Sequence, residues 1–220
     1  MRNLNLDGLS VHIGSQITNV QPFKNVLHVL NKLIKKTKIH FKFIDLGGGM
    51  GISYEKNNKK LNFKIYNSLI NKFLKKNNCK IIFEPGRSII GNAGILISKI
   101  IYIKKSKNKN FVILDAAMND LMRPALYGAK HQIIPSIKNK KNLNKIFEFV
   151  GPICESTDRF LTTNKFQNLK EGDVLIICDS GAYGMSLSSN YNVRPLSAEI
   201  LIKNSKIQVI RNRQKLSDLI

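Results

Sequence analysis

Hydrophobic residues in the first 90 positions follow two alternating spacings. Short apolar runs at residues 9–13, 41–46 and 80–84 predict strands, because they are bounded by polar and glycine-rich clusters. Between them, apolar residues recur every three or four positions at 23–34 and 65–74, which predicts two amphipathic helices. This order is typical of parallel β/α units, whose sites form at the carboxyl ends of the strands.

The pattern changes after about residue 94. Short β-rich runs there are separated by Lys, Asn and Gly turns, with little helical spacing between them. We therefore predict a β/α domain at residues 1–93 and a mainly β domain at residues 94–220. The β-rich runs are 94–105, 109–120, 131–137, 145–151, 172–183 and 197–203.

The formal net charge of +22 raises the question of nucleic-acid binding. Of the 36 basic residues, 29 are lysine, and many lie beside asparagine in runs such as 55–60. A nucleic-acid interface would favour arginine forks and interleaved aromatic side chains. Lysine runs of this kind are typical of solvated loops, so we expect no nucleic-acid partner.

Cysteine usage and hydropathy exclude several further classes. The three cysteines, Cys79, Cys154 and Cys178, cannot all pair within the chain and lack the spacing of a zinc site. No window approaches 18 uninterrupted apolar residues, as a membrane span requires. We expect a cytoplasmic protein that binds no metal and no membrane.

Several motifs carry polar chemistry, but none decides the function alone. The glycines at 47–49 follow a predicted strand and let backbone amides approach an anion, as a tight turn also would. They lack the last glycine of the dinucleotide-binding fingerprint. The "EPGRS" at 84–88 fits a turn with an exposed ion pair as well as a site.

The order of the motifs is more specific than any one of them. Together they resemble the fold-type III pyridoxal-phosphate decarboxylases, from about Gly8 to Ile210. Within that family, "MNDLMRPALY" followed by "GPICES" is most similar to the branch that acts on meso-diaminopimelate. The motifs are "HIGSQ", "DLGGGMGISY", "FEPGRSIIGNAG", "DAAMNDLMRPALYGAKH", "GPICESTD" and "DSGAYGMSLSSNYNVRP".

The resemblance implies a fold and an activity. The fold is α/β plus β, with the C-terminal, incomplete part of a cofactor-binding (β/α)8 barrel followed by a mainly β domain. The activity is that of a carboxy-lyase, converting meso-2,6-diaminopimelate to L-lysine and CO₂ in the last step of lysine biosynthesis. Decarboxylation of ornithine, arginine or carboxynorspermidine stays open, as does a catalytically dead remnant. The family forms homodimers that share active sites.

The resemblance also implies a set of residues that bind pyridoxal phosphate. His12 lies against the pyridine ring, Ser15 lies near the phosphate, and Glu84 faces the pyridine nitrogen, where a carboxylate favours the protonated ring. The full cofactor set is His12, Ser15, Gly47, Gly48, Gly49, Glu84, Pro85, Gly86, Arg87 and Tyr183.

A second set is implied for the substrate. Arg87 and Arg123 match carboxylate binders, since a guanidinium fork fits a carboxylate with two parallel hydrogen bonds. Tyr127, Glu155 and Tyr183 match further substrate contacts. Cys154 matches the proton donor, and a thiol is mostly protonated at neutral pH, as a donor must be. The loop that carries Cys154 and Glu155 is expected to complete the partner subunit's site.

One residue of the family pattern is not expected within these 220 positions. The family attaches its cofactor to a Schiff-base lysine on the first β/α unit, in a pattern close to Y-x-x-K-A. Lys130 in "YGAK" lies in the substrate-binding segment and is not expected to replace that lysine. We expect a fragment, the product of a split gene completed by a separate N-terminal chain, or a start site placed too late. Little activity is expected of the chain alone.

Overall fold

The computed structural model describes residues 3, 5–54, 60–138 and 141–220. The chain divides into two compact units, Met1–Asn92 and Ala93–Ile220. Within the described residues, no helix is long and apolar enough to cross a bilayer.

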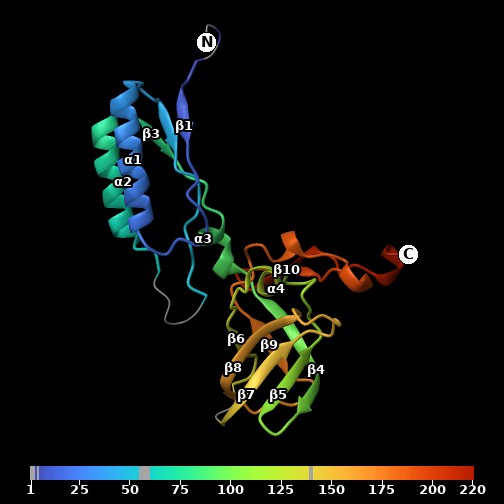
Figure 1. The fold of residues 1–220 in the computed structure, drawn as a ribbon. Coiled ribbons are helices and arrows are strands. Elements are labelled where there is room, and N and C mark those ends of the chain that lie inside the picture. The colour runs from blue at the N-terminus through green and yellow to red at the C-terminus, as the bar shows by residue number, and fades with distance from the viewer. Residues whose placement is uncertain (1–2, 4, 55–59, 139–140) are drawn as a thin grey trace. The chain divides into compact units, whose positions relative to one another are not determined.

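The first unit is a three-stranded parallel sheet with two helices on one face (Figure 1). The strands are ordered β1-β2-β3, and their last residues align in register. The predicted alternation of strands and helices is confirmed, although each strand is only three residues long. The elements are β1 (Gly8–Ser10), α1 (Gln21–Thr37), β2 (Phe43–Asp45), α2 (Phe63–Asn77), β3 (Lys80–Ile82) and α3 (Arg87–Ile90), followed by the 3-10 turn η1 (Gly91–Ala93).

Local sequence explains where the two long helices begin and end. Pro22 lies in the first turn of α1, where its missing N–H costs no hydrogen bond. The Asn62 side chain caps α2 by accepting from the Ile65 amide at 3.1 Å. Both helices end at left-handed residues, Lys38 with φ 56° and Asn78 with φ 43°.

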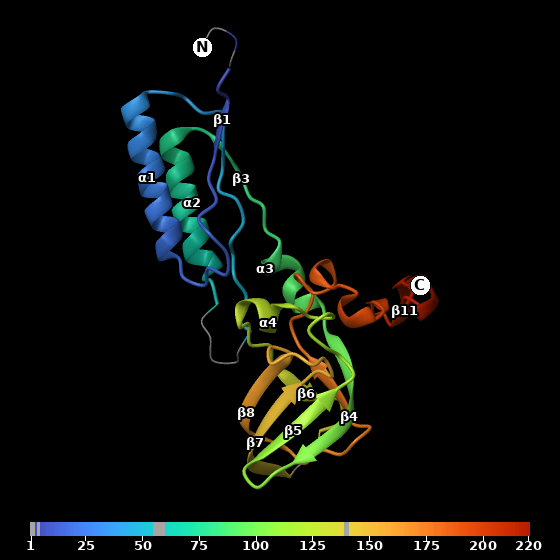
Figure 2. The same ribbon diagram turned by 45° about the vertical axis from the view of Figure 1, so that its right-hand side comes forward.

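The core of this unit forms between the helices and the sheet. Each helix buries residues about two turns apart, Phe23 and Leu30 on α1 and Tyr66 and Phe73 on α2. The rings of Phe23 and Tyr66 pack with centroids 4.6 Å apart, and α1 and α2 lie side by side (Figure 2). Ile44 on the central strand is fully buried against this cluster.

The second unit is mainly β, as predicted. Its six-stranded sheet has the order β6-β9-β4-β5-β7-β8, in which β5 and β7 are parallel and the other pairs antiparallel. The sequence pattern missed β8 and β11, because polar residues interrupt both. The elements are β4 (Leu96–Lys105), β5 (Lys109–Leu114), α4 (Arg123–Tyr127), β6 (Ile133–Pro135), β7 (Asn142–Val150), β8 (Arg159–Gln167), β9 (Val174–Ile177), η2 (Met185–Leu187), η3 (Tyr191–Val193), β10 (Glu199–Lys203), β11 (Lys206–Arg211) and η4 (Leu216–Asp218).

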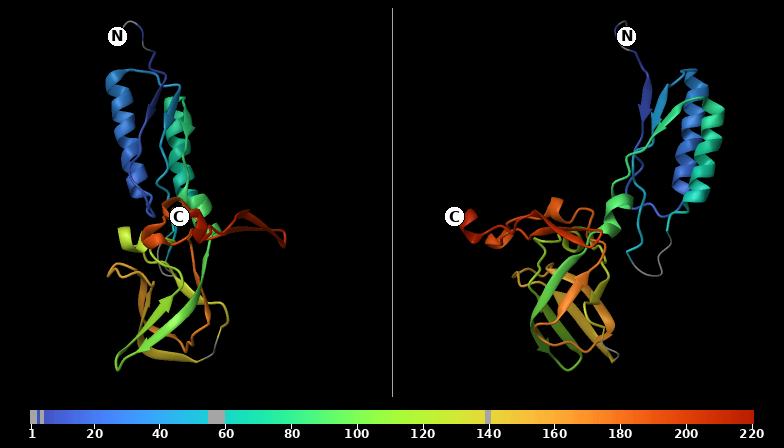
Figure 3. Two further views of the ribbon diagram at one scale, coloured as in Figure 1. Left: turned by 90° about the vertical axis from the view of Figure 1, so that its right-hand side faces the viewer. Right: turned by 180° about the vertical axis from the view of Figure 1, so that it is seen from behind.

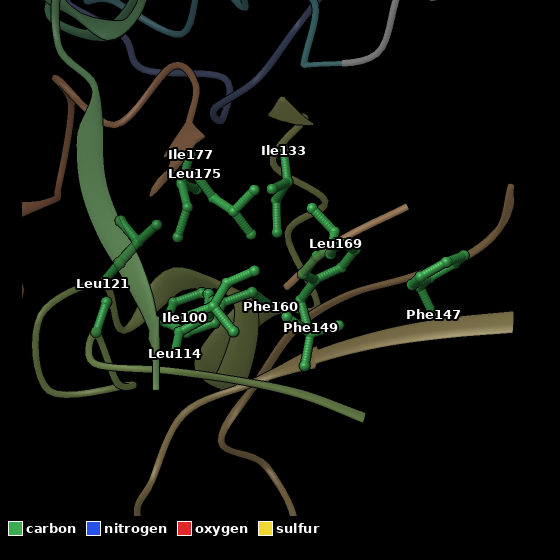
Figure 4. Close-up of a cluster of buried hydrophobic side chains, with 12 residues drawn as sticks. Ile100, Leu114, Leu121, Ile133, Phe147, Phe149, Phe160, Leu169, Leu175 and Ile177 are labelled. Atoms are coloured by element: carbon green, nitrogen blue, oxygen red, sulfur yellow. The ribbon is translucent and has the colours of Figure 1, made fainter. Parts of the chain in front are cut away.

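Apolar side chains from both ends of this sheet meet in one core (Figure 4). Leu114, Phe149 and Leu175, from three different strands, are fully buried there. The β10-β11 hairpin forms a separate two-stranded ribbon (Figure 3), and its apolar residues, among them Ile202 and Ile207, are exposed.

One buried carboxylate links three strands of the sheet. Glu148 on β7 pairs with Lys109 on β5, and Arg159 on β8 donates to it at 3.1 Å. Burial by itself raises the pKa of Glu148, but the hydrogen bonds and charges of Lys109 and Arg159 outweigh burial and hold the pKa below its usual value. The ionised form therefore stabilises the fold at neutral pH.

Candidate active site

Loops that leave the aligned ends of β1, β2 and β3 bring one group of predicted residues together in the first unit. The ends are Ser10, Asp45 and Ile82, paired in register. The loops are joined beyond the strands, because the Ile17 amide donates to the Gly49 carbonyl at 2.8 Å. On the other side, the Glu84 amide donates to the Gly47 carbonyl at 2.9 Å.

The glycine loop at 47–49 is packed too closely for side chains. A Cβ on Gly48 would lie 2.3 Å from the Glu84 carbonyl oxygen, and one on Gly49 would lie 2.4 Å from that of Gly14. Gly47 and Gly49 also have positive φ, at 64° and 82°, which other residues rarely adopt. The three glycines are therefore required by the close approach of neighbouring backbone.

Two side chains satisfy the first amides of the glycine loop. The Asp45 carboxylate accepts from the Gly47 amide at 2.8 Å, and the His12 Nδ1 accepts from the Gly48 amide at 3.3 Å. Asp45 also accepts from the Ser10 hydroxyl at 3.1 Å. The sequence predicted His12 but missed Asp45, which occupies the first position of the quoted "DLGGGMGISY".

Arg87 is oriented by two hydroxyl groups. Its Nη1 donates to the Tyr54 hydroxyl at 2.7 Å and its Nη2 to the Ser15 hydroxyl at 3.3 Å. Tyr54 is buried, and its ring centroid lies 5.9 Å from the guanidinium carbon. The structure thus joins the predicted residues Ser15 and Arg87 and adds Tyr54, which ends the same glycine motif.

Open space remains beside these groups. An added Cβ would meet nothing within 4 Å at Gly14 or at Gly86. His12, Ser15 and Glu84 are exposed to solvent. Donors from Ser15 and Arg87 beside two open glycines fit a phosphate-bearing cofactor, because such a group needs several donors and close backbone approach.

An apolar pocket of about 470 Å³ also lies in the first unit. It is lined by Tyr66 and Ile70 from α2, by Phe83 just after β3 and by Ile89 on α3. Burial raises the pKa of Tyr66 to about 12, so this phenol stays protonated. Of the predicted site residues, only Pro85 lines the pocket, so the pocket and the predicted donors are different places.

In the second unit, Arg123 and Tyr127 lie at opposite ends of the short helix α4. Arg123 is buried, whereas Tyr127 is exposed. The Arg123 Nη1 lies 2.9 Å from the His131 Nε2, and the His131 Nδ1 lies 2.8 Å from the Cys178 carbonyl oxygen. Because a guanidinium only donates and a carbonyl only accepts, His131 is the tautomer protonated at Nδ1. His131 is fully buried and was missed by the sequence analysis.

The loop 151–158 exposes the predicted pair Cys154 and Glu155. Its shape depends on the buried Asp158, whose carboxylate accepts from the Met118 amide at 2.7 Å and the Ile153 amide at 2.9 Å. Burial is the largest effect on Asp158 and raises its pKa, although both amides act in the opposite direction. Asp158 was not among the residues predicted from the sequence.

Cysteines and Tyr183 complete the predicted set. Cys79, Cys154 and Cys178 are free thiols. Tyr183 is half exposed and adopts a positive φ of 56°, uncommon for a bulky residue. A Cβ on the following Gly184 would lie 2.4 Å from the Ser180 carbonyl oxygen, so this tight turn needs its glycine.

Replacing Gly48 tests the packing of the glycine loop. Gly48→Ala should lower the free energy of unfolding by about 1–3 kcal/mol, because the new methyl group meets backbone that must move. Gly86→Ala is the control, with open space around it, and should change stability by less than about 0.5 kcal/mol. Urea denaturation followed by circular dichroism measures both. Equal effects would contradict the proposed packing.

Replacing Asp158 tests the support of the 151–158 loop. Asp158→Ala leaves the Met118 and Ile153 amides without their acceptor and should cost about 1–3 kcal/mol. Hydrogen exchange of the Ile153 amide should become faster as well. The neighbouring exposed Ser156→Ala serves as control. Unchanged exchange in Asp158→Ala would show that the loop is held by other contacts.

Comparisons with known proteins place the chain in a family. The family described as "Pyridoxal-dependent decarboxylase, C-terminal sheet domain" matches residues 15–181, more than half of the chain. A diaminopimelate decarboxylase of Vibrio cholerae is 41% identical over 220 residues, which are 99% of this chain and 52% of that protein.

Solved structures of diaminopimelate decarboxylases are similar to this chain in fold. A diaminopimelate decarboxylase from Helicobacter pylori, complexed with L-lysine, has a TM-score of 0.86 and 40% identity over 96% of this chain and 53% of its own. The corresponding enzyme from M. jannaschii has a TM-score of 0.88 and 35% identity over 96% of this chain and 50% of its own. The chain spans about half the length of the curated relatives it matches. It belongs to the family of pyridoxal-dependent decarboxylases and contains their C-terminal sheet domain.

Proposed function

We propose that this chain provides the C-terminal half of a pyridoxal-phosphate-dependent diaminopimelate decarboxylase, which converts meso-2,6-diaminopimelate to L-lysine and CO₂. The observation that carries the proposal is the 41% identity to such an enzyme across 99% of the chain. In this proposal the first unit is part of a (β/α)8 barrel that binds the cofactor. The second unit supplies substrate-binding residues and a homodimer interface.

The first unit would hold the cofactor. When bound, pyridoxal phosphate accepts the electron pair that remains on the substrate when CO₂ leaves. Ser15, Arg87 and the amides of the glycine loop 47–49 would hold the phosphate, with the Gly48 amide exchanging its 3.3 Å hydrogen bond to His12. The His12 ring would lie against the pyridine ring. Pro85 and Gly86 would allow the backbone to pass close beside the cofactor.

Glu84 would tune the cofactor. It follows β3 directly, and its backbone is held by the glycine loop, so its exposed carboxylate starts from a fixed position. A carboxylate beside the pyridine nitrogen favours the protonated ring and so strengthens its attraction for electrons.

The second unit would recognise both ends of the substrate. Arg123 would bind the carboxylate at the end that does not react. Arg87 of the first unit would bind a substrate carboxylate as well. Guanidinium groups suit this role because they pair with carboxylates through two hydrogen bonds. The orientation of Arg123 depends on His131, whose Nε2 lies 2.9 Å from the Arg123 Nη1. Tyr127, Glu155 and Tyr183 would make further contacts. An arginine for a distal carboxylate is useless to an enzyme for ornithine, which has none, so Arg123 favours diaminopimelate.

Cys154 would donate the proton that replaces CO₂. Its thiol is free and exposed on a loop that Asp158 holds in shape, so Sγ would be accessible to a substrate bound in another subunit. The proton moves from Sγ to the carbon that has lost CO₂. The rest of the barrel and its lysine would come from the part of the family's length that this chain does not cover, in the same polypeptide or in a separate one.

A completed enzyme tests the proposal. The chain is co-produced with the half of the Vibrio cholerae enzyme that it does not match, and CO₂ release is measured with pyridoxal phosphate. We expect turnover of meso-diaminopimelate at least about 10⁴-fold above that of ornithine, since a site built for a distal carboxylate rejects substrates that lack it. The chain alone should show almost no turnover.

Two outcomes would contradict the proposal. Preferential turnover of ornithine would show another decarboxylase of the family. A stable complex that releases no CO₂ would show a chain that has lost its activity.

A further inference from the structure

The short turn η3 holds two consecutive residues in an unusual backbone conformation. Asn192 has φ 54° and Val193 has φ 57°, both in the left-handed region. Asparagine tolerates this region, but a β-branched residue such as valine rarely adopts it. Such conformations persist only where surrounding contacts impose them, and they cluster at functional sites.

Contacts on both sides of the turn impose this conformation. Asn119 is fully buried and its Nδ2 donates to the Ser189 carbonyl at 3.2 Å, while its own carbonyl accepts from the Ser189 amide at 3.0 Å. The Arg194 Nε donates to the Asn119 Oδ1 at 2.9 Å. The Asn190 side chain closes the turn by donating to the Arg194 carbonyl at 2.9 Å. One buried asparagine therefore holds the chain before and after the turn.

This turn directs Tyr191 toward Glu155, 36 residues away in sequence. The Tyr191 hydroxyl donates to the Glu155 Oε1 at 2.6 Å, the short distance typical of a hydrogen bond to a charged acceptor. The hydrogen bond to Glu155 is the largest of the effects that raise the pKa of Tyr191. Both ends of the contact are fixed, since Asn119 anchors the turn and Asp158 shapes the loop of Glu155.

A contact between two exposed side chains can be incidental. An incidental contact would not need two left-handed residues beside the donor, because a non-glycine residue in this conformation costs stability. Glu155 uses one carboxylate oxygen for Tyr191, and its second oxygen remains able to accept from a ligand. A carboxylate held in this way can bind a substrate ammonium group without first losing its own freedom of movement.

We propose that Tyr191 is a positioning residue that fixes the Glu155 carboxylate for the ammonium group at the far end of the substrate. This inference rests on the proposed function, in which Glu155 contacts the substrate. It assigns a role to the "SSNYNVRP" segment that the predicted site residues did not include.

Steady-state kinetics of the completed enzyme test the role in binding. Tyr191→Phe keeps the ring but removes the hydroxyl, and KM for meso-diaminopimelate should rise on the order of tenfold with kcat changed less than about twofold. Tyr102→Phe, at an exposed tyrosine on β4, is the matched control and should change neither constant. In a Glu155→Gln background, Tyr191→Phe should add little, because Tyr191 acts through Glu155. Equal and independent losses from the two substitutions would overturn the proposal.

A titration of the chain itself tests the contact without any activity. Phenolate absorbance is followed against pH in wild type, Glu155→Gln and Tyr191→Phe. Besides Tyr66, which titrates late in all three proteins, the wild-type chain should contain a second late-titrating phenol that Tyr191→Phe removes and that Glu155→Gln moves to lower pH. An identical titration in wild type and Glu155→Gln would overturn the positioning role, even if decarboxylation is confirmed. Absence of decarboxylation in the completed wild-type enzyme would instead count against the proposed function.

Discussion

The close approach of backbone to backbone at the ends of three parallel strands is the constraint on which the first unit depends. Gly48 lies against the Glu84 carbonyl and Gly49 against the Gly14 carbonyl at distances that exclude any Cβ. Once these contacts form, the loop after each strand has a fixed path. The positions of the His12, Ser15 and Arg87 side chains are determined by that path. The helices α1 and α2 support this arrangement from one face of the sheet through the cluster around Phe23 and Tyr66. The arrangement of polar groups at the strand ends is therefore a consequence of backbone packing.

In the second unit, buried polar side chains fix the loops and side chains of the proposed site. Asp158, Asn119 and His131 are each almost fully buried, and each has its hydrogen bonds satisfied by backbone or by a neighbouring side chain. Asp158 holds the loop and His131 the side chain proposed to meet the substrate, and Asn119 holds the turn that carries Tyr191. A buried polar group is costly if left unpaired, so these three residues allow few alternative loop conformations. The sheet beneath them supplies an apolar core that such polar anchors cannot provide.

The sequence predicted what is periodic or locally encoded. The two long helices follow from apolar spacing, and the glycine loop follows from consecutive glycines after a strand. Strand ends were less accurate, since β1 ends at Ser10 and leaves His12 in a loop. The supporting residues were not predictable in the same way, because their partners are distant in sequence. Asp158 is 40 residues from Met118, and Arg194 is 75 residues from Asn119. Tyr54 and Asp45 lie within a motif that was recognised for its glycines alone.

If the first unit carries a cofactor site at its strand ends, nuclear magnetic resonance of the labelled chain will detect binding there. The ligand is pyridoxine 5′-phosphate, which cannot react with the many lysines, and pyridoxine without the phosphate is the control. We expect saturable shifts of the amide signals of Ser15, Gly47–Gly49 and Arg87 with the phosphate ester and much weaker shifts with pyridoxine. Shifts confined to the lysine-rich loops, or equal shifts with both compounds, would contradict such a site.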